Sequence, residues 1–551
     1  MKFLTYSIIA AMSSVTLFGC SDMDDMLPAS GSMTEGQIED TSNAISSRVN
    51  AALAGIYTYA GEMCAALDNS KIHCDYGYPS ICTAMDANSA DMVGDDSGYN
   101  WFTPAFDYSD RSPNYIIPQM RYAFLYKQIK LCNDVIGSID PETTVKELQY
   151  SLAQARAVRA FDYLNITPYF QFNYATSKDK PCIPIVSNTT ADPANNPRAT
   201  VKEVYDFIMS DLNYAVEHLE GFTPTTKVNI DQRVAYGLRA RANLYMENWT
   251  EAASDADKAM QGYTPASISD VDHPAFCDMN ESNNWMWAIH TEATTIKDYL
   301  YSPAAHLGSF SSNGYASGTG TYKCINSFLF DKIPATDVRK GWWVDENLHS
   351  ANLANCTWSF SGGTATGDSI ARLKISQVKV PFTKYTNVKF GQREGIGSDN
   401  NAYDWPLMRV EEMILIKAEG LAMSGNTSEA LTILNDFVKT YRDPSYSFNG
   451  LTADGIQTEI WKQRRIELWG EGFAMADIMR LHKPIVRIHG SNYGNWPSGF
   501  AFNISADDPY LLLRFPQLET NTNAGVTTKD NNEGTIPQSG QNGELLDGVT
   551  D

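Results

Sequence analysis

Aromatic side chains in loop-like stretches are the residues of this chain best suited to chemistry, and that chemistry is binding. Tyr99-Asn100-Trp101 lies in a Gly/Asp-rich stretch that has no helical period. Later candidates begin with Trp285, which starts an expected strand, and continue through Gly/Ser-rich sequence with Tyr299, Tyr301, Tyr315, Tyr322, Trp342, Trp343 and Trp358. Flat rings suit the apolar faces of pyranose sugars, and nearby Asn, Asp, Arg and Gln side chains can bond the hydroxyl groups.

We therefore predict that ligand-binding residues come from these aromatic stretches. Trp101 is the strongest candidate, because it belongs to no periodic apolar pattern that would predict its burial in a core. Burial is the alternative for each of the others: a Trp inside a strand is more often core, and neighbouring Trp342 and Trp343 cannot face the same side of an extended strand. The predicted binding residues are Trp101, Tyr99, Asn100, Trp285, Tyr315, Tyr322 and Trp342.

Catalytic signatures are missing from the sequence. We find no H-E-x-x-H, G-x-S-x-G, G-x-x-x-x-G-K or G-x-G-x-x-G pattern. Glu467 and Glu471 lie one helical turn apart and could mimic a carboxylate pair, but Arg464 and Arg465 precede them, which favours a structural Arg–Glu network. We expect no enzyme. A surface hydrolase stays the alternative, since any two of the 65 acidic residues could face each other across a sugar.

Cofactors are not expected. Asp270, Asp272 and Asp278 could hold a structural calcium ion, but they lack the full loop pattern of a calcium site. Eight cysteines remain once Cys20 is set aside, and none forms a C-x-x-C pair. Disulfides are permitted in an exported protein, although the sequence does not give their connectivity. The best disulfide candidates are Cys64, Cys74 and Cys82.

The first twenty residues predict export and lipidation. A charged start, an apolar run to Phe18 and the lipobox Leu17-Phe18-Gly19-Cys20 indicate a signal peptide over residues 1–19 and a lipid-modified Cys20. Two or three acyl chains would anchor the chain stably. An ordinary signal peptide with a chance cysteine is the alternative. The formal charge of −23 argues against nucleic acid and against an anionic membrane surface as ligands.

Helical periodicity dominates the rest of the chain, so we expect a mainly α protein with a loop-rich lobe of short strands. The expected parts are a tether at 20–40, a helical region at 41–265, a loop-rich ligand-binding region at 266–405, and helices followed by a polar tail at 406–551. Residues 238–260 and 414–434 each predict a helix pair of tetratricopeptide type, with Glu-Ala opening the second helix. Such pairs need neighbours to stack against.

The segment Glu459–Arg480 resembles the C-terminal signature of the SusD/RagB family. Positions that fit this signature are Arg464, Arg465, Glu467, Leu468, Glu471, Gly472, Phe473, Asp477 and Arg480. Further matches are the lipobox, Tyr126-x-x-Ile-x-x-Cys-Asn133, Ala153–Tyr163, Met408–Glu419 and Pro516-Gln-x-Glu519. The chain departs from the family's pattern by about thirty polar residues after the last of these matches and by its many cysteines.

This resemblance implies a SusD-like helical body and a nutrient-binding lipoprotein on the cell surface, anchored in the outer membrane of a Bacteroidetes bacterium. It also implies delivery of a glycan to a SusC-type TonB-dependent transporter, without catalysis. No ligand contact carries over by motif, and Trp101 matches only by its place in an early loop after Ala90-Asp91. The alternatives are a peptide-binding member of the same uptake system and a helical-repeat interaction scaffold.

Overall fold

The computed structural model describes residues 35–67, 72–96, 101–292 and 300–551. The chain divides into two units, residues 1–48 and 49–551. Within the first unit the described part is the beginning of helix α1 (Glu35–Tyr59). The expected signal peptide and Cys20 lie outside the described residues. In the part of the chain that is described, no helix has the length and apolar character needed to cross a membrane.

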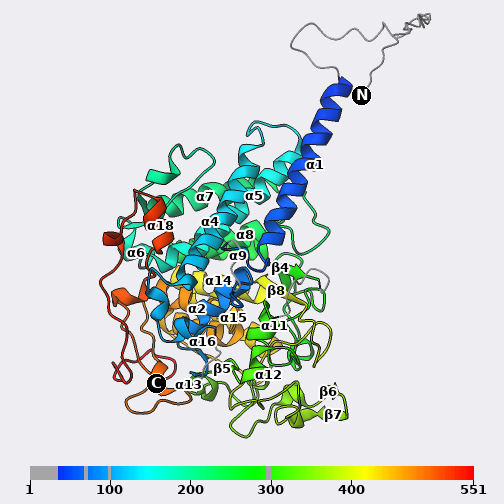
Figure 1. The fold of residues 1–551 in the computed structure, drawn as a ribbon, viewed down its shortest axis with the longest axis vertical. Helices are drawn as coiled ribbons and strands as arrows, with labels where there is room; N and C mark the ends of the chain where they lie inside the picture. The colour runs from blue at the N-terminus through cyan, green and yellow to red at the C-terminus, as the bar shows by residue number, and fades with distance from the viewer. Residues whose placement is uncertain (1–34, 68–71, 97–100, 293–299) are drawn as a thin grey trace, which may run out of the picture. The chain divides into compact units, whose positions relative to one another are not determined.

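Long helices packed side by side form the body of the second unit (Figure 1). Each packs on the next in the order α4, α5, α7, α8, α9 and α14, and α15 and α16 both pack on α14. Their bounds are α4 Ile116–Gly137, α5 Lys146–Ile166, α7 Val201–His218, α8 Gln232–Tyr245, α9 Trp249–Ala259, α14 Val410–Met423, α15 Thr427–Tyr441 and α16 Ala453–Glu467. The prediction of a mainly α fold is confirmed.

Shorter helices connect this body to the loop-rich parts. They are α2 Tyr78–Asn88, α3 Thr103–Phe106, α6 Tyr174–Ser177, α10 Ile268–Val271, α11 Pro303–His306, α12 Tyr315–Thr319, α13 Ser327–Asp331, α17 Ala474–Arg480 and α18 Gln517–Thr522.

Local sequence explains where the long helices begin and which face they bury. At α7, Thr200 caps the first turn by accepting a hydrogen bond from the Glu203 N–H at 3.2 Å, and the Glu203 carboxylate accepts one from the Thr200 N–H at 2.7 Å. Val204, Ile208 and Leu212, spaced at helical intervals, are fully buried. Capping and an apolar stripe together therefore determine this element.

The two helix pairs expected from the sequence are both present. Residues 238–260 fall in α8 and α9, and residues 414–434 fall in α14 and α15. Helices α9 and α14 pack directly on each other, so two pairs far apart in the sequence stack as neighbours. Each pair thereby covers apolar surface that the other could not bury alone.

Strands in the described residues form four antiparallel two-stranded sheets. The longest sheet joins β4 and β8 with a shifted register between Trp285 and Ala288. Part of it lies in the expected loop-rich region, which also carries α10 to α13. The pairs are β1 Met92–Val93 with β5 Cys324–Ile325, β2 Pro181–Pro184 with β3 Arg198–Thr200, β4 Trp285–Thr291 with β8 Tyr403–Arg409, and β6 Thr357–Phe360 with β7 Gly363–Thr366.

A buried ionic network surrounds the end of α16. The Glu467 carboxylate accepts hydrogen bonds from Arg442 at 2.8 Å, Arg409 at 3.2 Å and Arg339 at 3.3 Å. Burial alone would raise the pKa of Glu467, but the three guanidinium groups hold that pKa well below its usual value. Glu471 binds Arg409 and Lys389. Both glutamates are therefore structural ions.

The Arg–Glu interpretation of this helix is confirmed, but with different arginines. Arg464 pairs with Asp477, and Arg465 pairs with Asp91 at 2.6 Å and Asp547 at 2.7 Å. Sequence reasoning favoured the two arginines nearest in the chain. The actual partners of Glu467 come from distant segments that the fold brings to this helix end.

Candidate functional site

Three segments far apart in the sequence bring together five ring-bearing residues, which we name the aromatic group: His73, Trp101, Tyr301, His306 and Tyr315. His73 lies at its centre, with its ring stacked on Trp101 at 5.2 Å between centroids and tilted against Tyr301 at 4.7 Å. Tyr315 stacks on His306 at 4.7 Å and meets Trp101 edge-on at 6.4 Å. These contacts join the early loop of the chain to its loop-rich region.

Hydrogen bonds fix the histidines of this group. The Nδ1 atom of His73 is bonded to the Tyr315 hydroxyl. The Nε2–H of His306 points at the carbonyl oxygens of His73 at 2.9 Å and Leu300 at 3.0 Å. Burial, with a smaller effect of nearby Lys323, lowers the pKa of His306 to about 3. His306 is therefore a neutral, structural donor near pH 7.

Trp101 and His73 are the half-buried members of the group, whereas Tyr301, His306 and Tyr315 are buried. The Trp101 indole nitrogen is covered and has no hydrogen-bond partner among the described residues. What the Trp101 side chain offers at the surface is therefore ring carbon. Ring carbon backed by stacked rings is suited to the apolar face of a sugar.

Short helices position the rings. Trp101 precedes Phe102, the N-cap residue of α3, and Tyr315 is the first residue of α12. His306 ends α11, where the Ser302 hydroxyl caps the helix by accepting the Ala305 N–H at 3.1 Å. Trp101, His306 and Tyr315 therefore each lie at or near the end of a short helix.

Buried arginines hold the backbone on both sides of Trp101. The Arg487 guanidinium donates to the carbonyl oxygens of Ser89 at 3.1 Å and Phe106 at 2.6 Å. Arg465, from the signature helix α16, binds the Asp91 carboxylate, and the Trp469 indole N–H donates to the Asp91 carbonyl at 2.9 Å. The C-terminal part of the chain thus positions the early loop.

The structure brings two of the predicted binding residues, Trp101 and Tyr315, into one group. Trp285, Tyr322 and Trp342 lie in the core instead, with exposed fractions of 3%, 1% and 0%. Tyr99 and Asn100 lie outside the described residues.

Distant partners bury these three rings. The Tyr322 hydroxyl donates to the Val380 carbonyl at 2.7 Å, and the Trp342 indole N–H donates to the Val271 carbonyl at 2.9 Å. Trp285 is covered on strand β4, opposite Arg409 of β8. For the Trp342–Trp343 pair, both rings are buried, not only one of them.

Sequence reasoning did not select His73, Tyr301 or His306 for the site. Tyr301 was recognised as a loop aromatic but was not distinguished from its neighbours. His73 and His306 gave no signal in the sequence beyond lying near Gly, Ser or Asp residues. Only the fold reveals that the segments at 72–76 and 301–315 meet at Trp101.

The expected disulfides are not formed. Among the three candidates, Cys74 and Cys82 are free thiols, as are Cys132, Cys182, Cys277, Cys324 and Cys356. Burial raises the pKa of the Cys74 thiol to about 12, which marks an inert, buried side chain.

The three aspartates considered for calcium do not converge. Asp270 caps the start of α10, Asp272 lies beside His273, and Asp278 accepts the Asn280 N–H. Within the described ranges, no group of His, Cys, Asp and Glu side chains is arranged to hold a metal ion.

Comparisons with protein families match two parts of the chain, and the first of them contains His73 and Trp101. Residues 64–244 match the family described as "Starch-binding associating with outer membrane", and residues 342–537 match the SusD family. The chain is a SusD-like protein. SusD-like proteins are binding proteins, and the first of these family descriptions joins starch binding to association with the outer membrane.

Relatives of this SusD-like protein share its length and fold. SusD-like protein P38 of Formosa agariphila is 22% identical over 451 residues, which cover 76% of this chain and 85% of the relative. A solved SusD-like carbohydrate binding protein from Bacteroides vulgatus is 24% identical, with a TM-score of 0.71 over 89% of this chain and 99% of the other. A SusD superfamily protein from Bacteroides thetaiotaomicron is 20% identical, with a TM-score of 0.67 over 88% and 99%. These structures show the same fold.

Proposed function

We propose that this SusD-like protein captures an oligosaccharide at the cell surface, with the aromatic group as its binding site. It hands the glycan to a SusC-type TonB-dependent transporter and breaks no covalent bond. A lipid on Cys20 anchors it to the outer membrane. The observation that carries the proposal is the half-buried Trp101 ring, supported from behind by His73 and Tyr315.

The chemistry of the group favours a neutral sugar over a charged ligand. The group consists of aromatic rings, the neutral imidazole of His306 and the Tyr315 hydroxyl, which is already bonded to His73. Stacking on such rings contributes on the order of 1 kcal/mol for each aromatic–sugar contact, by analogy with aromatic pairs. Affinity should therefore be modest and should increase with the number of sugar rings in contact.

Isothermal titration with maltoheptaose and a panel of other oligosaccharides tests the site. Trp101→Ala should weaken binding of the glycan that binds by about fivefold or more, since about 1 kcal/mol corresponds to roughly that factor. Trp249→Ala is the matched control, because Trp249 is also half-buried but lies at the start of α9, outside the aromatic group. Unchanged affinity in Trp101→Ala would refute the site.

Partner and anchor need separate tests. Cross-linking in intact cells should recover a TonB-dependent transporter with the wild-type protein. Metabolic labelling with a palmitate analogue should mark the wild type and not Cys20→Ser.

Capture of peptides and not glycans from a mixed digest would instead favour the peptide-binding alternative. Release of reducing ends from a polysaccharide would contradict a purely binding role.

A further inference from the structure

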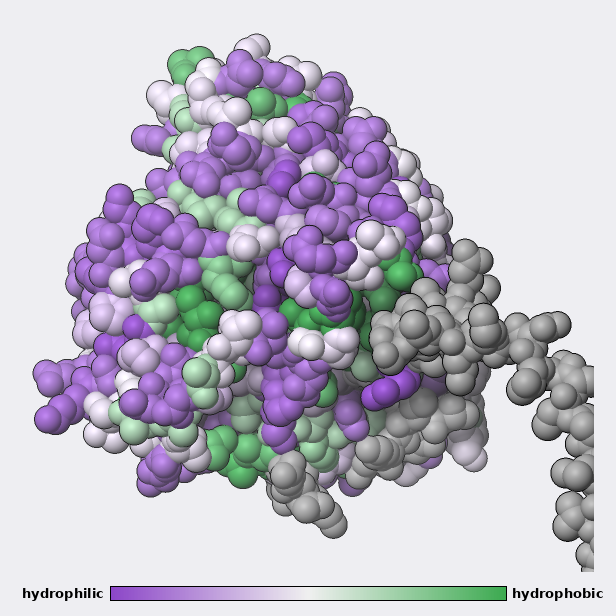
Figure 2. Space-filling view, turned by 90° about the horizontal axis from the view of Figure 1, so that it is seen from above, coloured by the Kyte–Doolittle hydropathy of each residue, from purple (hydrophilic) through white to green (hydrophobic). Residues whose placement is uncertain are grey.

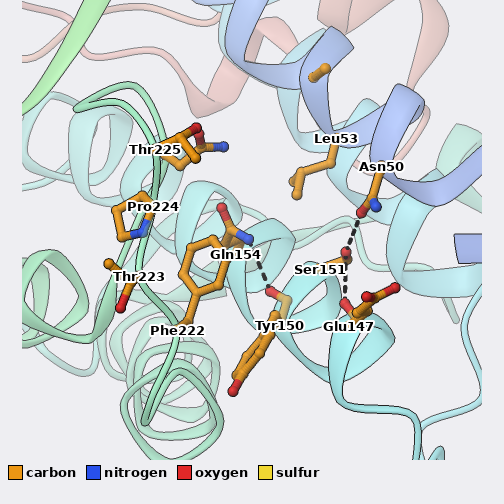
Figure 3. Close-up of a pocket in the computed structure, with 12 residues that line it drawn as sticks. Asn50, Leu53, Glu147, Tyr150, Ser151, Gln154, Phe222, Thr223, Pro224 and Thr225 are labelled. Carbon is orange, nitrogen blue, oxygen red and sulfur yellow. Dashed lines mark hydrogen bonds between the residues drawn. The ribbon is translucent and has the colours of Figure 1, made fainter. Parts of the chain in front are cut away.

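A cavity of about 330 Å³ lies between α1, α5 and the segment 222–229 (Figure 3). It shares no residue with the aromatic group. We propose that this cavity is a second carbohydrate site, which holds a single neutral sugar ring. Ligand sites range from about 300 to 1,000 Å³, so this volume suits one ring better than a chain of rings.

Apolar side chains form the walls of the cavity. Leu53 of α1 is buried on one side, and Phe222 and Pro224 are half-buried on the other. The Phe222 ring packs against Tyr150 with 5.1 Å between centroids, and the Tyr150 hydroxyl donates to the Glu220 carbonyl at 3.3 Å. Phe222 is thus held in place as a wall on which a sugar ring can pack.

Gln154 supplies a buried polar group whose orientation is fixed. It is 3% exposed, and its Oε1 accepts the Tyr57 hydroxyl at 2.9 Å, while that hydroxyl oxygen accepts the Ile230 N–H at 3.2 Å. Its Nε2 donates to the Tyr150 carbonyl at 3.3 Å. An amide nitrogen carries two N–H donors, so a second one is left for a ligand. Figure 3 shows this amide among the lining side chains.

Asn50 and Glu147 complete the polar lining. The buried Ser151 hydroxyl lies 3.0 Å from the Asn50 Oδ1 atom, which turns the Asn50 NH₂ group away from Ser151 (Figure 3). The Glu147 carboxylate forms no hydrogen bond or ion pair with the described residues. One carboxylate that accepts hydroxyl hydrogens and two amides that donate to hydroxyl oxygens match a neutral polyhydroxy ring. An anion would be repelled by Glu147.

Saturation-transfer difference NMR on the full chain tests this site with the methyl α-D-pyranosides of glucose, galactose and mannose. We expect a signal from at least one glycoside in the wild type and in Trp101→Ala, because the aromatic group is not needed. The signal should fall at least fivefold in Phe222→Ala and in Glu147→Gln. The matched controls are Phe360→Ala and Glu142→Gln, which alter a half-buried Phe and an exposed Glu outside the cavity.

The second site would be overturned if none of the three glycosides gave a signal. It would also be overturned if the signal were lost in Trp101→Ala, or if the cavity variants gave the same signal as their controls. Circular dichroism checks that Phe222→Ala is folded. If it is not, the surface variant Glu147→Gln decides. A failure of the proposed function would appear as unchanged oligosaccharide affinity in Trp101→Ala. That result says nothing about the cavity, because Phe222 and Glu147 are intact in this variant.

Discussion

Asp162 is a fully buried acid on α5 without a described partner. Neither carboxylate oxygen has a hydrogen bond among the described residues, and the side chain is 0% exposed. Burial raises the pKa of Asp162 well above its usual value. The folded protein therefore holds this proton to a higher pH than the unfolded chain does.

A pH dependence of stability follows from this retained proton. The contribution of Asp162 is fully favourable below about pH 4 and is lost as pH rises toward the folded-state pKa, by about 1.4 kcal/mol per pH unit. We expect Asp162→Asn to remove this decline, so its free energy of unfolding should gain on the wild type between pH 5 and pH 7. Urea unfolding at pH 5, 6 and 7 measures the difference. Asp134→Asn, at an exposed acid on α4, is the control and should show no such trend.

At the residue scale, the local sequence does not decide whether a loop aromatic is buried. Trp101 lies outside every periodic pattern, and its ring is half-buried in the aromatic group. Tyr322 and Trp342 have the same local composition around them, yet they bond to carbonyls of distant segments and are buried. Burial of a loop aromatic depends on which segment covers it, and the local sequence does not identify that segment.

At the scale of elements, the contact between α9 and α14 depends on a glycine. A Cβ atom at Gly420 would lie 2.5 Å from the Trp249 carbonyl oxygen and 3.0 Å from the Ala253 nitrogen. Backbone atoms at such distances cannot move aside without shifting the whole helix. Gly420 therefore allows the two helix pairs to approach closely.

Gly420→Ala should destabilise the protein by about 1–3 kcal/mol, because the added methyl group overpacks this interface. Gly55→Ala is a matched control inside α1, where an added Cβ meets no atom within 4 Å. That substitution should be neutral or stabilise by about 0.5–1 kcal/mol through helix propensity. Denaturant midpoints measure both effects. Equal midpoints for the two variants would show that the α9–α14 contact tolerates the extra volume.

Helix-level prediction was more successful than prediction of the loop-rich region. Both tetratricopeptide-type pairs were visible because apolar spacing and a Glu-Ala turn recur locally, as in α8–α9 and α14–α15. The sheet of β4 and β8 joins residues more than a hundred positions apart, and its register shifts near Trp287. Pairing of that kind depends on the completed fold, so the sequence predicted the start of β4 but not its partner.

At the scale of the whole second unit, Arg487 connects the C-terminal segment to both flanks of the Trp101 segment. Its guanidinium donates to five carbonyl oxygens, those of Ala87, Asn88, Ser89, Phe106 and Phe500. Burial lowers the pKa of Arg487 to about 10, so the group stays charged at neutral pH. One side chain thus joins two segments separated by nearly four hundred residues.

Arg487→Met keeps the apolar volume but leaves these carbonyl groups without their donor. Hydrogen bonds from a charged donor contribute about 1.5–3 kcal/mol each, so we expect a loss of at least about 3 kcal/mol in the free energy of unfolding. Hydrogen exchange should quicken in residues 87–93 and 102–106, while the α8–α9 and α14–α15 pairs keep their protection. Arg372→Met, at an exposed arginine, is the control. A uniform loss of protection over the whole chain would mean that Arg487 stabilises the fold in general and does not specifically hold the Trp101 segment.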